Sequence, residues 1–128
     1  MASGTGDTRV IVHFPEAMRV HTLGNMRDHL ATLEQINAAL AAAEYDRAAD
    51  LAEKRLGMTS LDAHGAAHLA AYMPEGMQQI GTRMHRAASR FGIEAQNAAV
   101  GNDPRPALRA LSEVMQQCVA CHAAYRLE

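Results

Sequence analysis

Two cysteines and a histidine that could hold a cofactor lie close to the C-terminus, in the run Cys118-Val119-Ala120-Cys121-His122. Two thiols at this spacing can each form a thioether with a vinyl group of haem, and the imidazole that follows can bind the iron. The motif therefore predicts one covalently attached haem c. Cys118 and Cys121 would be its attachment points, and His122 the proximal iron ligand.

The same motif has two other interpretations. A structural zinc site needs four protein ligands, and the chain has no cysteine beyond these two. A thioredoxin-like redox pair follows a strand within a βαβ unit, whereas the residues before Cys118 have the periodicity of a helix. A non-haem helical protein, in which Cys118 and Cys121 form a redox pair or bind a metal, is the alternative to haem attachment.

Length and composition indicate one helical domain. The 128 residues are rich in alanine, with two Phe, three Tyr and no Trp. Alanine favours helix, and the enrichment in aromatic and β-branched residues that is typical of strands is absent. The formal net charge of −2 gives no basis for binding nucleic acid or an anionic membrane surface, because both need clustered Lys and Arg. No apolar run reaches the roughly 20 residues of a membrane span.

Covalent attachment of haem to such a motif takes place outside the bacterial cytoplasm, so the motif predicts a periplasmic protein. The N-terminal residues Met1 to Asp7 lack the basic and apolar regions of a signal peptide. We therefore expect the signal peptide to be absent from this sequence because it was removed or replaced.

Turn and capping residues divide the chain into segments. Residues 1–14 are expected to form a flexible N-terminal lead-in, with Val10-Ile11-Val12 as a strand fragment or an extended stretch over one end of the core. Residues 15–128 are expected to form the helical domain. Prolines that suit a first turn, and apolar periodicity, predict four longer helices, at 15–43, 46–56, 74–100 and from 104 onward. A crossover connection at 58–75 would carry a short helix over 63–72.

The apolar stripes of these helices indicate which helix face carries the haem motif. The stripe of the first predicted helix has spacings of three and four residues and consists of Leu23, Met26, Leu30, Leu33, Asn37 and Leu40. In the last helix, Cys118 and His122 continue the stripe of Leu108, Leu111 and Met115. Because the haem-binding residues share the face of these core residues, we expect the haem to lie inside the helical assembly.

Four helices in a line, with the haem motif on the last of them, resemble the cytochrome c prime family and its low-spin, methionine-ligated relatives. The specific part of the resemblance is the stretch from Cys118 to Arg126, in which the haem motif is followed by two residues, Tyr125 and Arg126. The resemblance implies an all-α fold, a left-handed antiparallel four-helix bundle with a crossover connection between helices 2 and 3. It also implies that Arg126 lies by the proximal face of the haem, where a cation could tune the imidazole.

The resemblance further implies that a residue of the first helix covers the sixth position of the iron. Met26 there would give a six-coordinate, low-spin iron suited to electron transfer. Leu23, which stands four residues after Arg19 as the distal residue often does in the family, would leave the iron five-coordinate and open to a small gas. Arg19 and Arg27 are candidates for binding the haem propionates, although a solvated helix face explains each of them as well.

The first functional hypothesis is thus a periplasmic carrier of one electron, with iron bound by His122 and Met26. Its partners would be redox proteins, and it would not be an enzyme. The second is a protein that binds nitric oxide or carbon monoxide, with Leu23 over the distal face. The third is the non-haem module. The resemblance also implies a homodimer through the first two helices.

The remaining histidines have no assigned role. His64 and His68 are four residues apart, which would place them on one face of a helix at a metal-binding spacing. No third ligand stands beside them, and ordinary residues of the crossover are the simpler interpretation. His21 or His29 could approach the haem as another sixth ligand. His85, which has Arg83 and Arg86 close by, is expected to be exposed.

Overall fold

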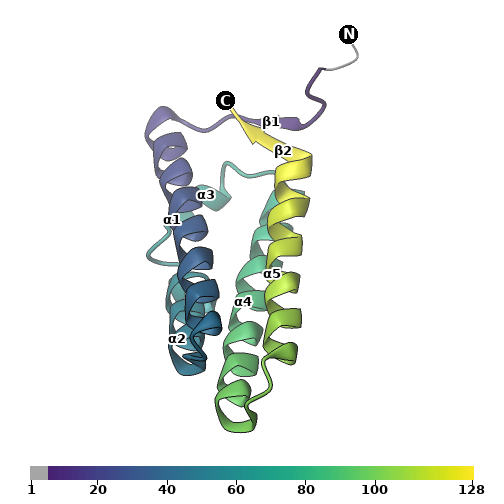
Figure 1. Cartoon of the computed structure of the whole chain (residues 1–128). Coiled ribbons are helices and arrows are strands. Elements are labelled where there is room, and N and C mark those ends of the chain that lie inside the picture. The colour runs from purple at the N-terminus through teal and green to yellow at the C-terminus, as the bar shows by residue number, and fades with distance from the viewer. Residues whose placement is uncertain (1–5) are drawn as a thin grey trace.

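Four long helices run alongside one another in the computed structural model, which describes residues 6–128 (Figure 1). They are α1 (Glu16–Ala41), α2 (Tyr45–Arg55), α4 (Glu75–Gly101) and α5 (Arg105–Ala124). A single 3₁₀ turn at Met58–Ser60 and the short helix α3 (Ala66–Ala70) form the connection between α2 and α4. Within the described residues the regular structure is therefore helical apart from two strands of three residues each, and the all-α class is confirmed.

Prolines mark where three of these helices begin. Pro15, Pro74 and Pro104 each directly precede a helix, and the next residue is acidic in α1 and α4. A fixed backbone angle suits this position, and a carboxylate in the first turn complements the helix dipole. The last residue of α4 is followed by Asn102 in the left-handed conformation, with φ of 57°. Asparagine tolerates that conformation and ends the helix there.

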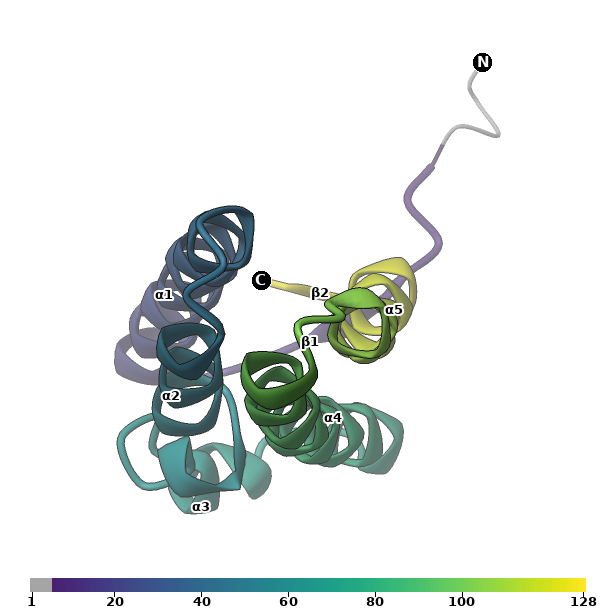
Figure 2. The same ribbon diagram turned by 60° about the horizontal axis from the view of Figure 1, so that its bottom comes forward.

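Small side chains set the packing of the long helices. Figures 1 and 2 both show α2 beside α1 and α4 beside α5. At the centre lies Phe91 of α4, which has no exposed surface. It is surrounded by alanines from α2, α4 and α5 that are almost completely buried: Ala48, Ala52, Ala88, Ala95 and Ala107. Because alanine projects so little, the helix backbones can approach closely around a single large ring.

In the N-terminal segment, Val10-Ile11-Val12 forms a strand, which is one of the two conformations expected for it. Strand β1 (Val10–Val12) pairs in parallel with strand β2 (Tyr125–Leu127), so that Ile11 lies opposite Arg126. Val12 and Phe14 are buried. Residues 1–5 lie outside the described part of the chain. The strand pairing was not predicted, because three residues at each end of a chain show no alternation that could be recognised.

The predicted stripe of α1 is wrong in part. Leu40 is buried, but Leu30 is 71% exposed and Met26 is 36% exposed. Besides Leu40, the buried residues of α1 are Thr22, Thr32, Ile36 and Ala39, which lie outside the predicted stripe. On α5, Leu111 is buried as expected, whereas Leu108 and Met115 are about half exposed. Both helices thus carry apolar residues on a face that no other helix of the described chain covers.

The crossover between α2 and α4 is less helical than predicted. Instead of one helix over 63–72, α3 covers only Ala66–Ala70, with turns directly before and after it. Gly65, which directly precedes α3, has a φ of 67°, a conformation that other residues adopt at a cost. Among the described residues, none of the helices is both long and apolar enough to span a membrane.

Candidate functional site

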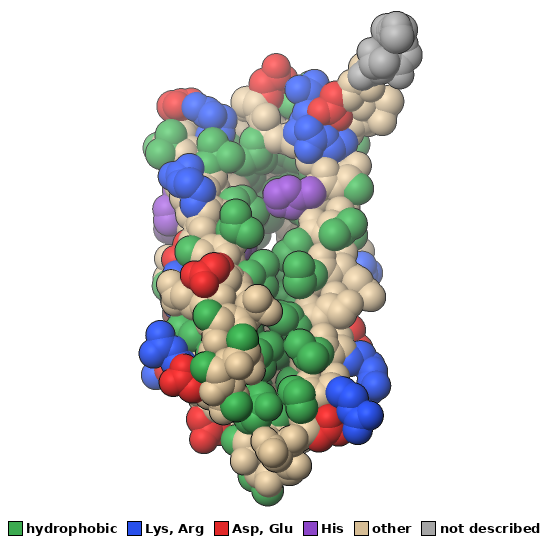
Figure 3. Space-filling model, viewed as in Figure 1, with side chains coloured by type: hydrophobic (Ala, Val, Ile, Leu, Met, Phe, Trp, Pro, Cys, Tyr) green, Lys and Arg blue, Asp and Glu red, His purple; other side chains and the backbone are tan. Residues whose placement is uncertain are grey.

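A cleft opens between α1 and α5, with α4 as its floor. Its volume is about 570 Å³, within the range of roughly 300–1,000 Å³ that is typical of sites for small ligands. Figure 3 shows apolar side chains gathered along this hollow. Apart from four residues the lining is apolar or sulfur-containing; α1 supplies Met26, Arg27, His29, Leu30 and Leu33, α4 supplies Ile80, Gly81 and Met84, and α5 supplies Gln117, Cys118, Val119, Cys121 and His122.

The α5 wall brings the whole haem motif into this cleft. Both cysteines are free and half-buried, and burial raises the pKa of the Cys118 and Cys121 thiols. The Cys118 thiol donates a hydrogen bond to the Val114 carbonyl one turn earlier, at 3.6 Å. His122 lines the cleft too, but it is exposed and does not lie on a buried face as we had expected. Two thiols and an imidazole therefore face one apolar space.

Of the two predicted distal residues on α1, one lines the cleft and the other does not. Met26 lines the cleft opposite the haem motif, and so does His29. Leu23 is half-buried and does not line the cleft. Of the two arginines predicted to bind propionates, Arg27 lies in the lining. Arg19 is paired with Glu16 at 2.8 Å and lies outside it.

Arg126 lies on β2, outside the lining of the cleft. Its guanidinium forms an ion pair with Asp7, with 3.7 Å between Nε and Oδ2. Arg9, which sequence reasoning had not singled out, holds the same carboxylate and also donates a hydrogen bond to the main-chain carbonyl of His122 at 3.2 Å. These residues are 113 positions apart, and no local pattern connects them.

Behind the α1 wall, three histidines from different segments form a cluster that sequence reasoning missed. The ring centroid of His29 lies 4.8 Å from that of His64 and 6.2 Å from that of His85, and the last two are 6.4 Å apart. His64 is buried and precedes α3, while His68 is exposed, so the two histidines do not lie on one face of a helix. His85 is half-buried and not exposed as predicted.

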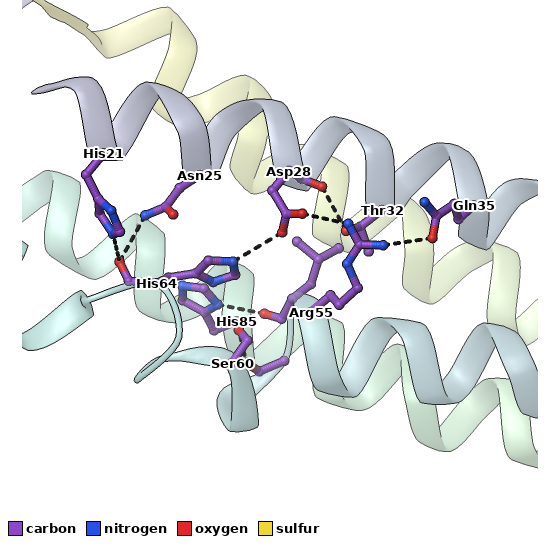
Figure 4. A network of polar contacts seen from close by, with 11 residues as sticks. His21, Asn25, Asp28, Thr32, Gln35, Arg55, Ser60, His64 and His85 are labelled. Carbon is purple, nitrogen blue, oxygen red and sulfur yellow. Dashed lines mark hydrogen bonds and ion pairs between the residues drawn. The ribbon is translucent and has the colours of Figure 1, made fainter.

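Hydrogen bonds hold two of the three rings (Figure 4). His64 Nε2 lies 3.4 Å from Asp28 Oδ2, and His85 Nδ1 lies 2.6 Å from the Leu56 carbonyl. Because an ionised carboxylate and a carbonyl can only accept, each of these nitrogens donates. The His64 carbonyl in turn accepts from His21 and Asn25 of α1. The connection between α2 and α4 is thereby tied to both α1 and α4.

Two nitrogens of the cluster, Nε2 of His29 and Nδ1 of His64, are buried with no hydrogen-bond partner among the described residues. Burial, and then the neighbouring imidazoles, lower the pKa of His29 to about 4. Burial also lowers the pKa of His85, against the effect of its bond to Leu56. Within the described part of the chain, no three His, Cys, Asp or Glu side chains are arranged to hold a metal ion.

Arg55 and Asp28 complete this region. Burial would raise the pKa of the Asp28 carboxyl, but hydrogen bonds from Arg55 and His64 outweigh it and the pKa is lowered. Arg55 of α2 donates to Asp28 at 2.6 Å and to Gln35 at 2.7 Å, both on α1 (Figure 4). These contacts join α2 to the rear of the helix that carries Met26.

Comparisons of the chain with protein-family models, with curated proteins and with solved structures gave no match.

Proposed function

We propose that the chain is a monohaem c-type cytochrome that carries one electron between redox proteins. The observation that carries this proposal is that Cys118, Cys121 and His122 line the same apolar cleft as Met26, which comes from the opposite wall. A pair of thiols, an imidazole and a thioether on facing helices are the donor set of a haem c with His and Met as axial ligands.

The residues of the cleft fit this group. The apolar side chains of the lining would contact the porphyrin, and its half-buried free thiols are available for thioether formation. The face of α1 that carries Leu30 and Met26 is exposed, although it is apolar. An apolar surface of this kind, facing a cleft, is typical of a ligand site. The fit thus also explains why the predicted stripe of α1 is not covered by another helix.

When bound, haem supplies an iron that can change its charge by one electron. The chain's residues would hold it in place: Cys118 and Cys121 by covalent bonds, and His122 and Met26 as the two axial ligands. A thioether ligand favours the reduced iron and raises the reduction potential. Because His122 and Met26 would both bind the iron, a substrate would have no access to it, and such an arrangement would suit electron transfer and not catalysis.

Arg27 supplies the cation of the lining and could pair with a propionate. The alternative in which Leu23 covers an open iron receives no support from the geometry, since Leu23 does not line the cleft. We also propose that the long helices form the antiparallel four-helix bundle of the cytochrome c prime family, with the crossover between its second and third helices, and that the protein is periplasmic.

Optical spectra of the protein, produced together with the haem-attachment machinery, test this function. The wild type should give sharp, split α and β bands when reduced, and a weak sulfur-to-iron band when oxidised. Met26→Ala should lose the sulfur-to-iron band, whereas Met115→Ala, a matched change outside the cleft, should keep it. A high-spin spectrum that is indifferent to Met26→Ala and shifts with carbon monoxide would contradict ligation by Met26 and favour gas binding.

A further inference from the structure

The last turn of α5 carries the proximal histidine of the proposed haem site, and it ends in carbonyl groups that the helix itself cannot satisfy. The N–H of Tyr125 donates a hydrogen bond to the Cys121 carbonyl. The next carbonyl, that of His122, instead accepts a hydrogen bond from Arg9 Nη1 at 3.2 Å. The group that binds the main chain of His122 thus comes from the other end of the sequence.

Arg9 reaches this carbonyl in a fixed orientation. Its Nε lies 2.9 Å from Asp7 Oδ1 and its Nη2 lies 2.6 Å from Asp7 Oδ2. The main-chain N–H of Arg9 also donates to Asp7 Oδ1, at 3.1 Å. A guanidinium held by two parallel bonds to a carboxylate has little freedom left to turn. Asp7 therefore directs the remaining Nη1 toward α5.

Four further contacts attach the same region of the chain. Strand β1 pairs with β2 directly after the contact of Arg9, and the N–H of Glu128 donates to the Val12 carbonyl at 3.2 Å. Arg126 approaches Asp7 from β2. On the other side, Tyr125 packs so closely over Gly76 of α4 that a Cβ at Gly76 would collide with its hydroxyl. These contacts fix both the N-terminal segment and the residues that follow α5 against the end of this helix.

We propose that Arg9 is a positioning residue for His122: by binding its main-chain carbonyl, it fixes the last turn of α5 and with it the plane of the imidazole. This inference rests on the proposed function, because it treats His122 as an iron ligand. Arg9 does not touch the iron or the haem in this role. It acts through the main chain of the residue that does.

The chain contains a matched control. Asp103 and Arg105 repeat the local arrangement at the start of α5, with the main-chain N–H of Arg105 at 3.1 Å and its Nε at 2.9 Å from Asp103 Oδ1. Within residues 6–128, Arg105 makes no long-range hydrogen bond of the kind that Arg9 makes to His122. Arg105→Ala removes the same local ion pair and leaves the haem motif untouched.

Two measurements on Arg9→Ala, Arg9→Lys and Arg105→Ala test the proposal. In haem-free protein, hydrogen exchange of the amides of residues 125–127 should accelerate about tenfold in Arg9→Ala, the change expected for loss of one charge-assisted hydrogen bond. In the oxidised haem protein, the hyperfine-shifted NMR signals of the His122 ring should move in Arg9→Ala, because they depend on the orientation of the ring. Arg9→Lys should restore part of both properties.

The two measurements separate the possible failures. Faster exchange with unmoved His122 signals would show a merely structural role and overturn the inference. An equal effect of Arg105→Ala on either property would overturn it as well. If the wild type attaches no haem at all, the proposed function fails, and a positioning role for His122 falls with it. The exchange data would still report whether Arg9 holds the end of α5.

Discussion

The histidine cluster makes the stability of the protein depend on pH in a way that can be calculated for His29. The pKa of His29 is about 4 in the folded protein, against 6.5 for an unperturbed imidazole. Between these values the unfolded chain binds a proton that the folded protein does not, so acid favours unfolding. The contribution of His29 is complete above pH 6.5 and is lost as the pH falls toward 4. The full loss amounts to about 3 kcal/mol.

Urea denaturation of the haem-free protein, followed by circular dichroism at a series of pH values, measures this loss. From about pH 8 to about pH 5, His29 should contribute about 2 kcal/mol to the decrease in the free energy of unfolding. Replacing His29 by leucine removes the titration together with the buried, unpartnered Nε2 of this ring. This variant should therefore show a flatter dependence on pH than the wild type. His68→Leu, which changes an exposed histidine, should behave like the wild type.

Acid also protonates the paired carboxylates, but this effect is common to all three proteins and cancels in their comparison. An NMR titration of the His29 ring in the wild type gives the pKa directly, even if the leucine variant folds poorly. Parallel pH profiles of the wild type and His29→Leu, or a ring that titrates near 6.5, would refute the reasoning. Either result would mean that water reaches the His29 imidazole and that the histidine cluster is open to solvent.

Three further predictions concern the cleft and the core. Leu30→Ala should lower the free energy of unfolding only a little in haem-free protein, where Leu30 is 71% exposed, but by about 1–2 kcal/mol more once haem covers the side chain. Urea denaturation of both forms measures the difference. Leu108→Ala, which changes a residue outside the cleft, should show no such difference. Phe91→Ala should lower the free energy of unfolding by about 3–5 kcal/mol in both forms, and a loss below about 1 kcal/mol would contradict the burial of this ring. Because burial raises the pKa of the Cys118 and Cys121 thiols, iodoacetamide at neutral pH should modify haem-free protein more slowly than urea-unfolded protein; equal rates would argue against the half-buried site.

Local signals sufficed for the long helices. Pro15, Pro74 and Pro104 marked three of the helix starts, since proline acts through its own backbone angle and does not depend on distant residues. The spacing of Cys118 and His122 put them one turn apart, and the structure gathers both with Met26 at one cleft. Whether that cleft holds haem remains a prediction.

Other features depend on the rest of the chain and could not be predicted. Met26 and Leu30 form an apolar stripe whether it faces a core or a cleft, so periodicity could not distinguish these environments. The histidine cluster joins α1, the crossover and α4, and the arginines near His85 gave a misleading signal of exposure. The strand pairing between the two ends of the chain likewise has no local cause.

Intact mass spectrometry of the denatured protein, after production with and without the haem-attachment machinery, decides whether haem is bound as proposed. With the machinery, the mass should increase by one haem that survives denaturation, and the double variant Cys118→Ala and Cys121→Ala should lose it. A folded wild-type protein that gains no haem mass under these conditions would contradict the cytochrome assignment. Cys118 and Cys121 would then have to act as a redox pair or bind a metal in a non-haem helical protein.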